Sequence, residues 1–411
     1  MKILFTAPRF HTNQVPIVKG LIEKGHEVRY FVAFEGAIED HRFCQPDVLK
    51  PSREMSRQWK KMSRKKSESE VESIVGGRFV PDFALLKEKI KGWQPDFVIC
   101  RGKMNLTLCV NSICSELHIP CILYDQEPVF VRKSTAERQP NPACSTGLII
   151  RFQTKIKRML SADQRMLRKL RETTGYPDVR FSPVKYRLSD QSYDLIQSSR
   201  SYYIPLVYEA PDEAESRIYF SQGIINLLMV GKYREYKSIP VLISALEKVK
   251  QYDNWHLTII GQASNRDEIE YKKAVWNQIV RAGIEKRITL RDSCPYEEMR
   301  KVYESNDLLI LPSKRETYGM AIVEAMAHGL AVICSDTCGA AFCNAEAGGL
   351  IVKQGDADAL KQAIVSLLDK KEVIRRNGLN SMMYIKNNLS CDVFYSRLSK
   401  LLESEFNISM K

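Results

Sequence analysis

The C-terminal half of this 411-residue chain alternates short apolar runs with amphipathic segments. Residues 224–230 form an apolar run that only Asn226 interrupts, and a segment with helical period follows at 238–249. A strand that is apolar at nearly every position has to be covered on both faces, as in a parallel sheet between helices. Further runs of strand length occur at 256–260, 288–290, 308–311 and 331–334. We therefore expect this half to form a doubly wound parallel α/β domain.

The N-terminal half shows the same alternation. Strands are expected at 2–6, 27–33, 97–100 and 121–124, and helices at 14–24 and 105–117. The expected boundaries are an N-terminal Rossmann-like domain at 1–205, a linker at 206–223, a second Rossmann-like domain at 224–388 and a final segment at 389–411 with a helix at 392–405. Two such domains predict a cleft between them, with ligands beyond the carboxyl ends of the strands.

Composition and charge exclude several classes of protein. No stretch approaches the roughly 20 apolar residues that span a bilayer. The first apolar run meets Pro8 and Arg9, unlike a secretory signal, so a cytoplasmic location is expected. The 11 cysteines lack the paired spacing of a zinc site and are expected to be reduced.

The net charge is +13, and residues 1–222 hold most of it, with 36 Lys/Arg against 26 Asp/Glu. This excess implies an anionic partner. No recognised nucleic-acid module occurs, so a phosphorylated ligand or an anionic membrane is favoured over nucleic acid.

The most informative motif follows the strand expected at 308–311. A loop carrying Glu316 leads into a helix that begins near Gly319, and Glu324 lies on that helix. Free N–H groups at a helix start favour a phosphate or an electron-rich sugar oxygen. Glycine lets the backbone approach a ligand. A helix with an acidic first turn is the plain alternative, but Glu316 precedes the helix.

A second motif follows the strand expected at 224–230. Lys232 and Lys237 lie just past the strand end, where two cations could straddle a diphosphate. A solvated basic loop is the alternative interpretation.

Together these motifs resemble the retaining GT-B glycosyltransferases with an E-x7-E motif, of group 1 or family 4 type. Glu316 and Glu324 have that spacing. Lys232 stands where the family has arginine, and Lys237 stands at the family's lysine. The resemblance implies a nucleotide-sugar donor on the C-terminal domain, an acceptor on the N-terminal domain, and a C-terminal helix that returns to the N-terminal domain.

The resemblance also implies transfer of a hexose type of sugar with retention. Lys232 and Lys237 would stabilise charge on the β-phosphate, each by about 3 kcal/mol. Glu316 would orient the sugar, and Glu324 would hold the ribose. The remaining donor contacts would come from Thr317, Tyr318, Gly319, Met320 and, near the base, Arg291. Since lysines supply the charge, no metal or other cofactor is expected, and Asp356 of an Asp-Ala-Asp run is expected to cap a helix.

The acceptor side is expected in loops after the N-terminal strands. The candidate residues are Arg9, His11, Asn13, Arg101, Asp125, Gln126 and Glu127. Several relatives have a histidine near the position of Gln126, and its absence leaves that role open among the last three. The alternative is that these are solvated loop side chains that bind nothing.

Two basic stretches suggest a membrane surface. Residues 53–66 contain seven Lys/Arg, and Met55, Trp59 and Met62 recur at helical spacing. Such a helix can lie in a membrane interface. The residues proposed for this contact are Trp59, Lys60, Lys61 and Lys65. Residues 151–171 are similarly basic, and for both stretches packing of the apolar stripe on the core is the alternative.

The prediction is thus a peripheral, cytoplasmic glycosyltransferase that extends a glycan or lipid-linked acceptor of the lipopolysaccharide or polysaccharide type. A nucleotide-sugar epimerase on the same fold is one alternative. A catalytically degenerate nucleotide- or membrane-binding relative is another. The presence of Lys237, Glu316 and Glu324 argues against the degenerate relative.

Overall fold

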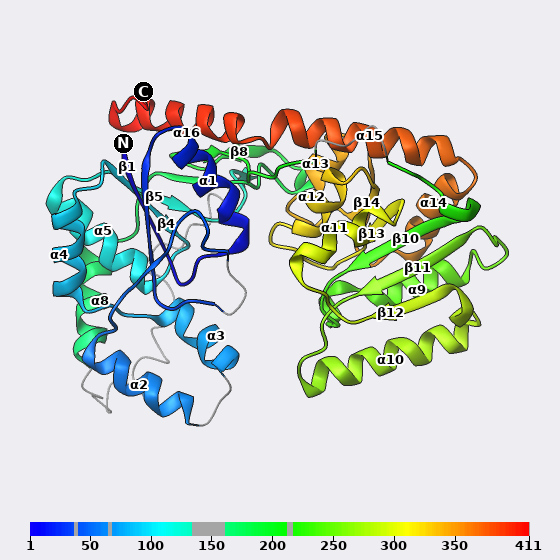
Figure 1. Ribbon diagram of the computed structural model, residues 1–411, viewed down its shortest axis with the longest axis horizontal. Coiled ribbons are helices and arrows are strands. Elements are labelled where there is room, and N and C mark those ends of the chain that lie inside the picture. The colour runs from blue at the N-terminus through cyan, green and yellow to red at the C-terminus, as the bar shows by residue number, and fades with distance from the viewer. Residues whose placement is uncertain (37–39, 65–67, 134–160, 212–216, 411) are drawn as a thin grey trace. The chain divides into compact units, whose positions relative to one another are not determined.

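A computed structural model describes residues 1–36, 40–64, 68–133, 161–211 and 217–410 (Figure 1). The chain divides into two compact units. Unit 1 comprises Met1–Pro183, Ile196–Val207 and Phe394–Lys411, and unit 2 comprises Val184–Leu195 and Tyr208–Val393. The short stretch Val184–Leu195, which the sequence analysis placed in the first domain, therefore belongs with the second.

Unit 1 is built on a seven-stranded parallel sheet. Its strands, in spatial order, are β3 (Asp47–Val48), β2 (Glu27–Val32), β1 (Lys2–Ala7), β4 (Phe97–Arg101), β5 (Cys121–Tyr124), β7 (Arg180–Ser182) and β9 (Ser201–Tyr203). Because β1 neighbours β4 and β4 neighbours β5, the loops that follow these three strands emerge at one edge. A separate two-stranded sheet pairs β6 (Phe130–Arg132) with β8 (Leu195–Gln197).

Helices cover this sheet with their apolar sides. They are α1 (Val15–Glu23), α2 (Arg53–Ser63), α3 (Glu68–Arg78), α4 (Phe83–Trp93), α5 (Asn105–Leu117) and α8 (Ala162–Thr173). Helix α5 carries the apolar stripe Cys109, Val110 and Ile113, all fully buried in the core. Every cysteine among the described residues is a free thiol.

The last helix, α16 (Cys391–Phe406), contributes to unit 1 from Phe394 onward. The Phe394 ring packs edge-on against Phe181, with centroids 6.3 Å apart. The Tyr395 hydroxyl shares a 3.0 Å hydrogen bond with His26, before β2. Residues distant in sequence thus complete one core.

Unit 2 contains a six-stranded parallel sheet. Its strands, in spatial order, are β12 (Ile288–Arg291), β11 (Trp255–Ile260), β10 (Ile225–Val230), β13 (Leu308–Leu311), β14 (Ala331–Ser335) and β15 (Leu350–Val352). Its helices are α9 (Ile239–Glu247), α10 (Arg266–Ala282), α11 (Tyr296–Glu304), α12 (Met320–Ala327), α13 (Ala341–Glu346), α14 (Ala357–Leu368) and α15 (Lys371–Asn388). The strands expected from apolar runs lie within one residue of the observed ends, and the expected class of two doubly wound parallel α/β domains is confirmed.

The expected linker 206–223 is only partly a connection. Residues 212–216 lie outside the described residues. Beyond them, the Tyr219 hydroxyl donates to the carbonyl of Gly329 at 2.7 Å, and the Phe220 amide donates to Asp307 at 3.0 Å. This end of the segment is therefore packed into unit 2. Nowhere in the described chain is there a helix with the length and apolar character needed to cross a membrane.

Candidate functional site

Two residues predicted for one site, Lys237 and Glu316, are in direct contact. Lys237 Nζ donates to Glu316 Oε1 at 2.5 Å, although the residues are 79 positions apart. The Ser313 hydroxyl donates to the same oxygen at 2.9 Å. The Lys237 and Glu316 side chains are only 11% and 13% exposed. The ion pair is therefore shielded from solvent, and its charges interact more strongly than they would in water.

The absence of a side chain at Gly231 leaves room for the Lys237 side chain. Gly231, directly after β10, has a φ of +155°, and a Cβ added there would lie 2.6 Å from Lys237 Cε. Gly261, directly after β11, comes so close that its own Cβ would overlap the Gly231 carbonyl. The Lys232 side chain, on the same loop, is exposed and makes no hydrogen bond or ion pair with any residue that the structure describes. The structure thus joins only the second of the two predicted lysines to Glu316.

The start of α12 has unoccupied hydrogen-bond donors. Its N-cap is Gly319, at φ +96°, and no side chain caps the helix. The Ile322 amide donates to the Gly319 carbonyl at 2.9 Å, whereas the amides of Met320 and Ala321 belong to the donors that a helix leaves without internal partners. A left-handed N-cap of this kind favours glycine. The start of α12 lies next to the ion pair, since a Cβ on Gly319 would be 3.7 Å from Glu316 Cβ.

Residues that the sequence analysis did not single out hold this loop in place. Arg187 Nη1 donates to the carbonyls of Glu316 and Thr337, at 3.1 and 2.8 Å. A Cβ on Gly339 would lie 2.2 Å from the Thr317 carbonyl oxygen, so the backbones there are in direct contact. Arg187 comes from the stretch before β8, 129 residues from Glu316. Nothing in the local sequence pattern marks it.

Glu324 is bound by a different neighbour. The Tyr303 hydroxyl donates to Glu324 Oε2 at 2.5 Å. The Tyr303 ring stacks on His328, with centroids 5.4 Å apart and planes 7° from parallel. Burial raises the pKa of Glu324, and the Tyr303 hydrogen bond acts in the opposite direction. Among the described residues, no hydrogen bond reaches the second carboxyl oxygen, Oε1.

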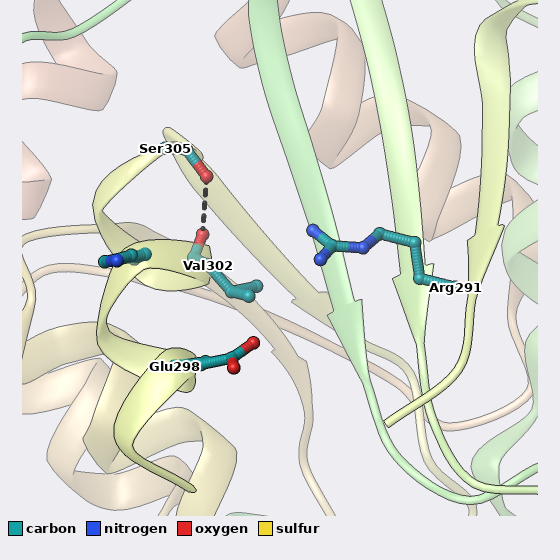
Figure 2. Close-up of a pocket in the computed structure, with 5 residues that line it drawn as sticks. Arg291, Glu298, Val302 and Ser305 are labelled. Atoms are coloured by element: carbon teal, nitrogen blue, oxygen red, sulfur yellow. Dashed lines mark hydrogen bonds between the residues drawn. The ribbon is translucent and has the colours of Figure 1, made fainter. Parts of the chain in front are cut away.

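Arg291 lines a cavity of about 360 Å³ in unit 2. It lies at the end of β12, and Figure 2 shows its guanidinium pointing toward α11, from which Glu298 and Val302 face it. Lys301 and Ser305 complete the lining. Helix α11 also carries Tyr303, so one helix borders this cavity and binds Glu324.

In unit 1 the predicted acceptor residues of the β1 and β4 loops come together around His11. Burial, with the nearby charges of Arg101 and Arg9, lowers the pKa of His11 to about 3. The Arg101 guanidinium lies 5.8 Å from the centre of the Tyr124 ring. Arg101 Nη1 and Asn13 Oδ1 are buried without a hydrogen-bond partner among the described residues.

The loop after β5 is occupied by an internal ion pair. Arg180 Nη1 donates to Asp125 at 2.9 Å and also to the carbonyl of Glu127. The Asp125 carboxylate in turn accepts from the Glu127 amide at 3.1 Å. Gln126 lies between them and is partly buried. Asp125 therefore has a structural partner that the sequence did not indicate.

Asp356 is the N-cap of α14, as predicted. Its carboxylate accepts from the amides of Asp358 and Ala359, at 3.0 and 2.8 Å. Asp358 pairs with Lys248 at 2.6 Å. Within the described ranges, no group of three or more metal-type side chains is placed to hold an ion.

The apolar stripes of the basic helices face the core. The Trp59 ring contacts Phe34 and Phe79 edge-on, and Met55 is buried. Leu167, in α8, is buried in the same core. The expectation of a Trp59 stripe turned outward is therefore wrong, because these side chains fill unit 1. Lys60 and Lys61 are exposed, whereas Lys65 and residues 151–160 lie outside the described residues.

The sequence has known relatives, which match part of its length. Residues 216–382 match the family Glycosyl transferases group 1. The D-inositol 3-phosphate glycosyltransferase of Corynebacterium efficiens is 30% identical over 162 residues, 38% of each chain. The lipopolysaccharide core biosynthesis mannosyltransferase LpcC of Rhizobium leguminosarum is 24% identical over 192 residues, 45% of this chain and 53% of that one. The match thus spans about two fifths to one half of these relatives' length.

Solved structures match the whole fold. Sucrose-phosphate synthase from Thermosynechococcus elongatus has a TM-score of 0.62 at 15% identity and covers 99% of both chains. Anabaena HepE, in complex with UDP and glucose, has a TM-score of 0.62 at 14% identity, covering 98% of this chain and all of that one. The chain therefore has the GT-B fold, and its segment similar to glycosyl transferases group 1 contains Lys237, Glu316 and Glu324.

Proposed function

We propose that the protein is a glycosyltransferase that moves a sugar from a nucleotide-sugar donor, with retention, to a glycan or lipid-linked acceptor. The observation that carries this proposal is the shielded Lys237–Glu316 pair beside the uncapped start of α12. It lies within the segment similar to glycosyl transferases group 1. A cation, a carboxylate and free amides in one place suit a sugar joined to a diphosphate.

In this proposal, each group has a separate task. Lys237 and the amides around Met320 stabilise the negative charge that builds on the leaving diphosphate. The exposed Lys232 ammonium adds to this stabilisation. Preorganised donors of this kind are each worth about 3 kcal/mol of barrier. Glu316 turns from Lys237 to the sugar hydroxyls as the donor binds. Because lysine supplies positive charge at the phosphate, the mechanism uses no metal.

In this proposal, the nucleoside binds in unit 2 between Glu324 and the cavity beside Arg291. Glu324 accepts from the ribose hydroxyls through Oε1 while Tyr303 holds Oε2. The cavity beside Arg291 is close to the volume of a small ligand site and receives the base. Helix α11 joins the two, because it carries both Tyr303 and the cavity wall.

The acceptor class is inferred from relatives. LpcC acts in lipopolysaccharide core biosynthesis, and a Xanthomonas oryzae relative is a GDP-mannose:cellobiosyl-diphosphopolyprenol alpha-mannosyltransferase, 26% identical over 144 residues. Both names describe glycan extension. We propose an acceptor of this type for the present chain.

The first test is a thermal-shift panel of UDP, GDP, ADP and dTDP with wild type, Glu324→Ala and Glu247→Ala. Glu247 is an exposed acid on α9 and serves as the matched control. A ligand at a hundred times its Kd stabilises by about 2.7 kcal/mol. One nucleotide is expected to stand out in wild type and control and to lose its shift in Glu324→Ala. No shift with any nucleotide would favour a degenerate relative that binds a membrane rather than a nucleotide.

Turnover then separates transferase from epimerase. The matching nucleotide sugar is incubated with and without a glycan acceptor mixture, and free nucleotide and sugar configuration are measured. A transferase releases nucleoside diphosphate in proportion to acceptor. Conversion of the donor sugar without release of nucleotide would identify an epimerase instead.

We also propose that unit 1 binds an anionic membrane surface by charge, at the cytoplasmic face. Five exposed cations support this: Arg53, Arg57, Lys60 and Lys61 on α2, and Arg64 at its C-cap. Each cation near an anionic leaflet is worth about 1 kcal/mol. Co-sedimentation with phosphatidylglycerol vesicles is expected to exceed that with phosphatidylcholine and to fall with salt. Equal, negligible binding to both would refute it.

A further inference from the structure

Unit 1 contains a cluster of half-buried basic and polar side chains at the carboxyl ends of two adjacent strands, which we call the basic recess: Arg9, His11, Asn13 and Arg101. Arg9 and His11 lie in the loop after β1, and Arg101 is the last residue of β4. The strands pair in parallel with Thr6 opposite Cys100, which places the end of β4 beside the start of the β1 loop. Arg9 and Arg101 both act electrostatically on His11, so the three side chains converge.

The two arginines have no counter-ion in the described parts of the chain. Neither forms an ion pair or donates a hydrogen bond there, and both are only partly exposed. Arg101 Nη1 is a buried donor without an acceptor, and such a group costs roughly 1–3 kcal/mol or more when it carries charge. Asp125, an acid in the loop after the neighbouring strand β5, is already paired with Arg180 at 2.9 Å. Two partly desolvated positive charges therefore have no counter-ion among the described residues.

The recess also holds neutral groups that could contact the remainder of a ligand. Asn13 Oδ1 is a buried acceptor without a donor among the described residues, which suits a hydroxyl. His11 is neutral at physiological pH, so one ring nitrogen donates and the other accepts. Two guanidinium groups, each able to bind an oxyanion bidentately, therefore lie beside groups that can bind a polyol.

We propose that the recess of Arg9, His11, Asn13 and Arg101 binds an anionic group, phosphate or carboxylate, carried by the acceptor sugar. This inference rests on the proposed function and names the acceptor class. A neutral acceptor would leave both guanidinium charges desolvated and unpaired, whereas an anion neutralises them. Asn13 then accepts from a hydroxyl next to the anionic group.

The test is a binding assay by calorimetry at saturating UDP, or whichever nucleoside diphosphate stabilises the protein, so that the basic site of unit 2 is filled. The probes are matched pairs: myo-inositol with inositol 1-phosphate, and glucose with glucose 6-phosphate and glucuronate. At least one anionic sugar is expected to bind about tenfold or more tightly than its neutral partner. Indistinguishable affinities within every pair would overturn the proposal.

Substitutions at Arg101 test whether the anionic sugar binds in the recess. Arg101→Gln is expected to remove most of the preference for the anionic sugar, and Arg101→Lys to keep part of it because the charge remains. Arg29→Gln, which removes an exposed guanidinium from β2, is the matched control and leaves the preference intact. An unchanged preference in Arg101→Gln, with an unchanged melting temperature, would overturn the assignment.

The same variants distinguish the two possible sources of the anion. If the recess serves the acceptor, Arg101→Gln binds the nucleoside diphosphate with wild-type affinity. An equal loss of nucleotide affinity would assign the recess to the donor diphosphate and overturn the proposal. A protein that binds no nucleotide, yet still prefers anionic sugars when assayed without one, would refute the proposed function and leave the recess in place.

Discussion

At the scale of single residues, the contact between Tyr303 and Glu324 makes a pH-dependent prediction. Burial raises the pKa of Glu324, and the hydrogen bond from Tyr303 stabilises its ionised form. In Tyr303→Phe the pKa rises further, so the carboxyl is protonated at a higher pH. Nucleoside diphosphate affinity is expected to fall about tenfold at neutral pH. As pH decreases, affinity should decline earlier in the variant than in wild type, which calorimetry between pH 5 and 8 would measure. Parallel pH profiles would show that Tyr303 acts only in packing.

The Lys237–Glu316 pair predicts that a double variant regains stability without regaining turnover. Lys237→Gln leaves the Glu316 carboxylate, 13% exposed, without its cation, which costs up to about 3 kcal/mol of unfolding free energy. The double variant Lys237→Gln/Glu316→Gln removes both charges, so its urea midpoint is expected to return toward wild type. Its turnover should stay at least about 100-fold reduced, because the donor at the diphosphate is missing. Recovery of turnover with stability would refute a catalytic role for Lys237.

At the scale of elements, Asp356 distinguishes a helix cap from a metal ligand. Its carboxylate accepts from two amides at the start of α14, so Asp356→Ala is expected to lower the unfolding free energy by about 1 kcal/mol. Asp358→Asn, at an exposed neighbour, is the control and should change stability little. Turnover of both variants is expected to match wild type, with and without EDTA. A turnover loss in Asp356→Ala that added divalent cation restores would contradict the cap.

The elements also show what the sequence could predict. Apolar runs placed the ends of β10 and β13 within one residue, because a strand buried on both faces leaves a pattern in its own sequence. Trp59 has the correct helical period, yet period alone does not tell whether a stripe faces lipid or core. The Lys237–Glu316 contact was not predictable, because strand order places two loops together without fixing which side chains pair. Arg187 donates to this loop from 129 residues away and leaves no local signal.

At the scale of the whole molecule, the chain completes its first unit with its last helix. Leu398 of α16 is fully buried within unit 1, although most of unit 2 lies between it and β9 in the sequence. Leu398→Ala is expected to cost about 2–5 kcal/mol, the usual range for a buried leucine. Because the lost contacts belong to unit 1, amide exchange should accelerate in peptides from 1–183. Ser396→Ala, an exposed change on the same helix, is the matched control.

The same amide-exchange experiment, repeated with bound nucleotide, tests the stability of unit 2. A nucleoside diphosphate bound beside Lys237 stabilises the state of unit 2 that binds it, by about 2.7 kcal/mol at a hundred times Kd. Exchange should therefore slow in peptides from 225–352 of Leu398→Ala as much as in wild type, while unit 1 stays less protected. If nucleotide restored protection in 1–183 as well, the two units would unfold as one cooperative body. Acceleration confined to unit 2 would contradict the assignment of α16 to the core of unit 1.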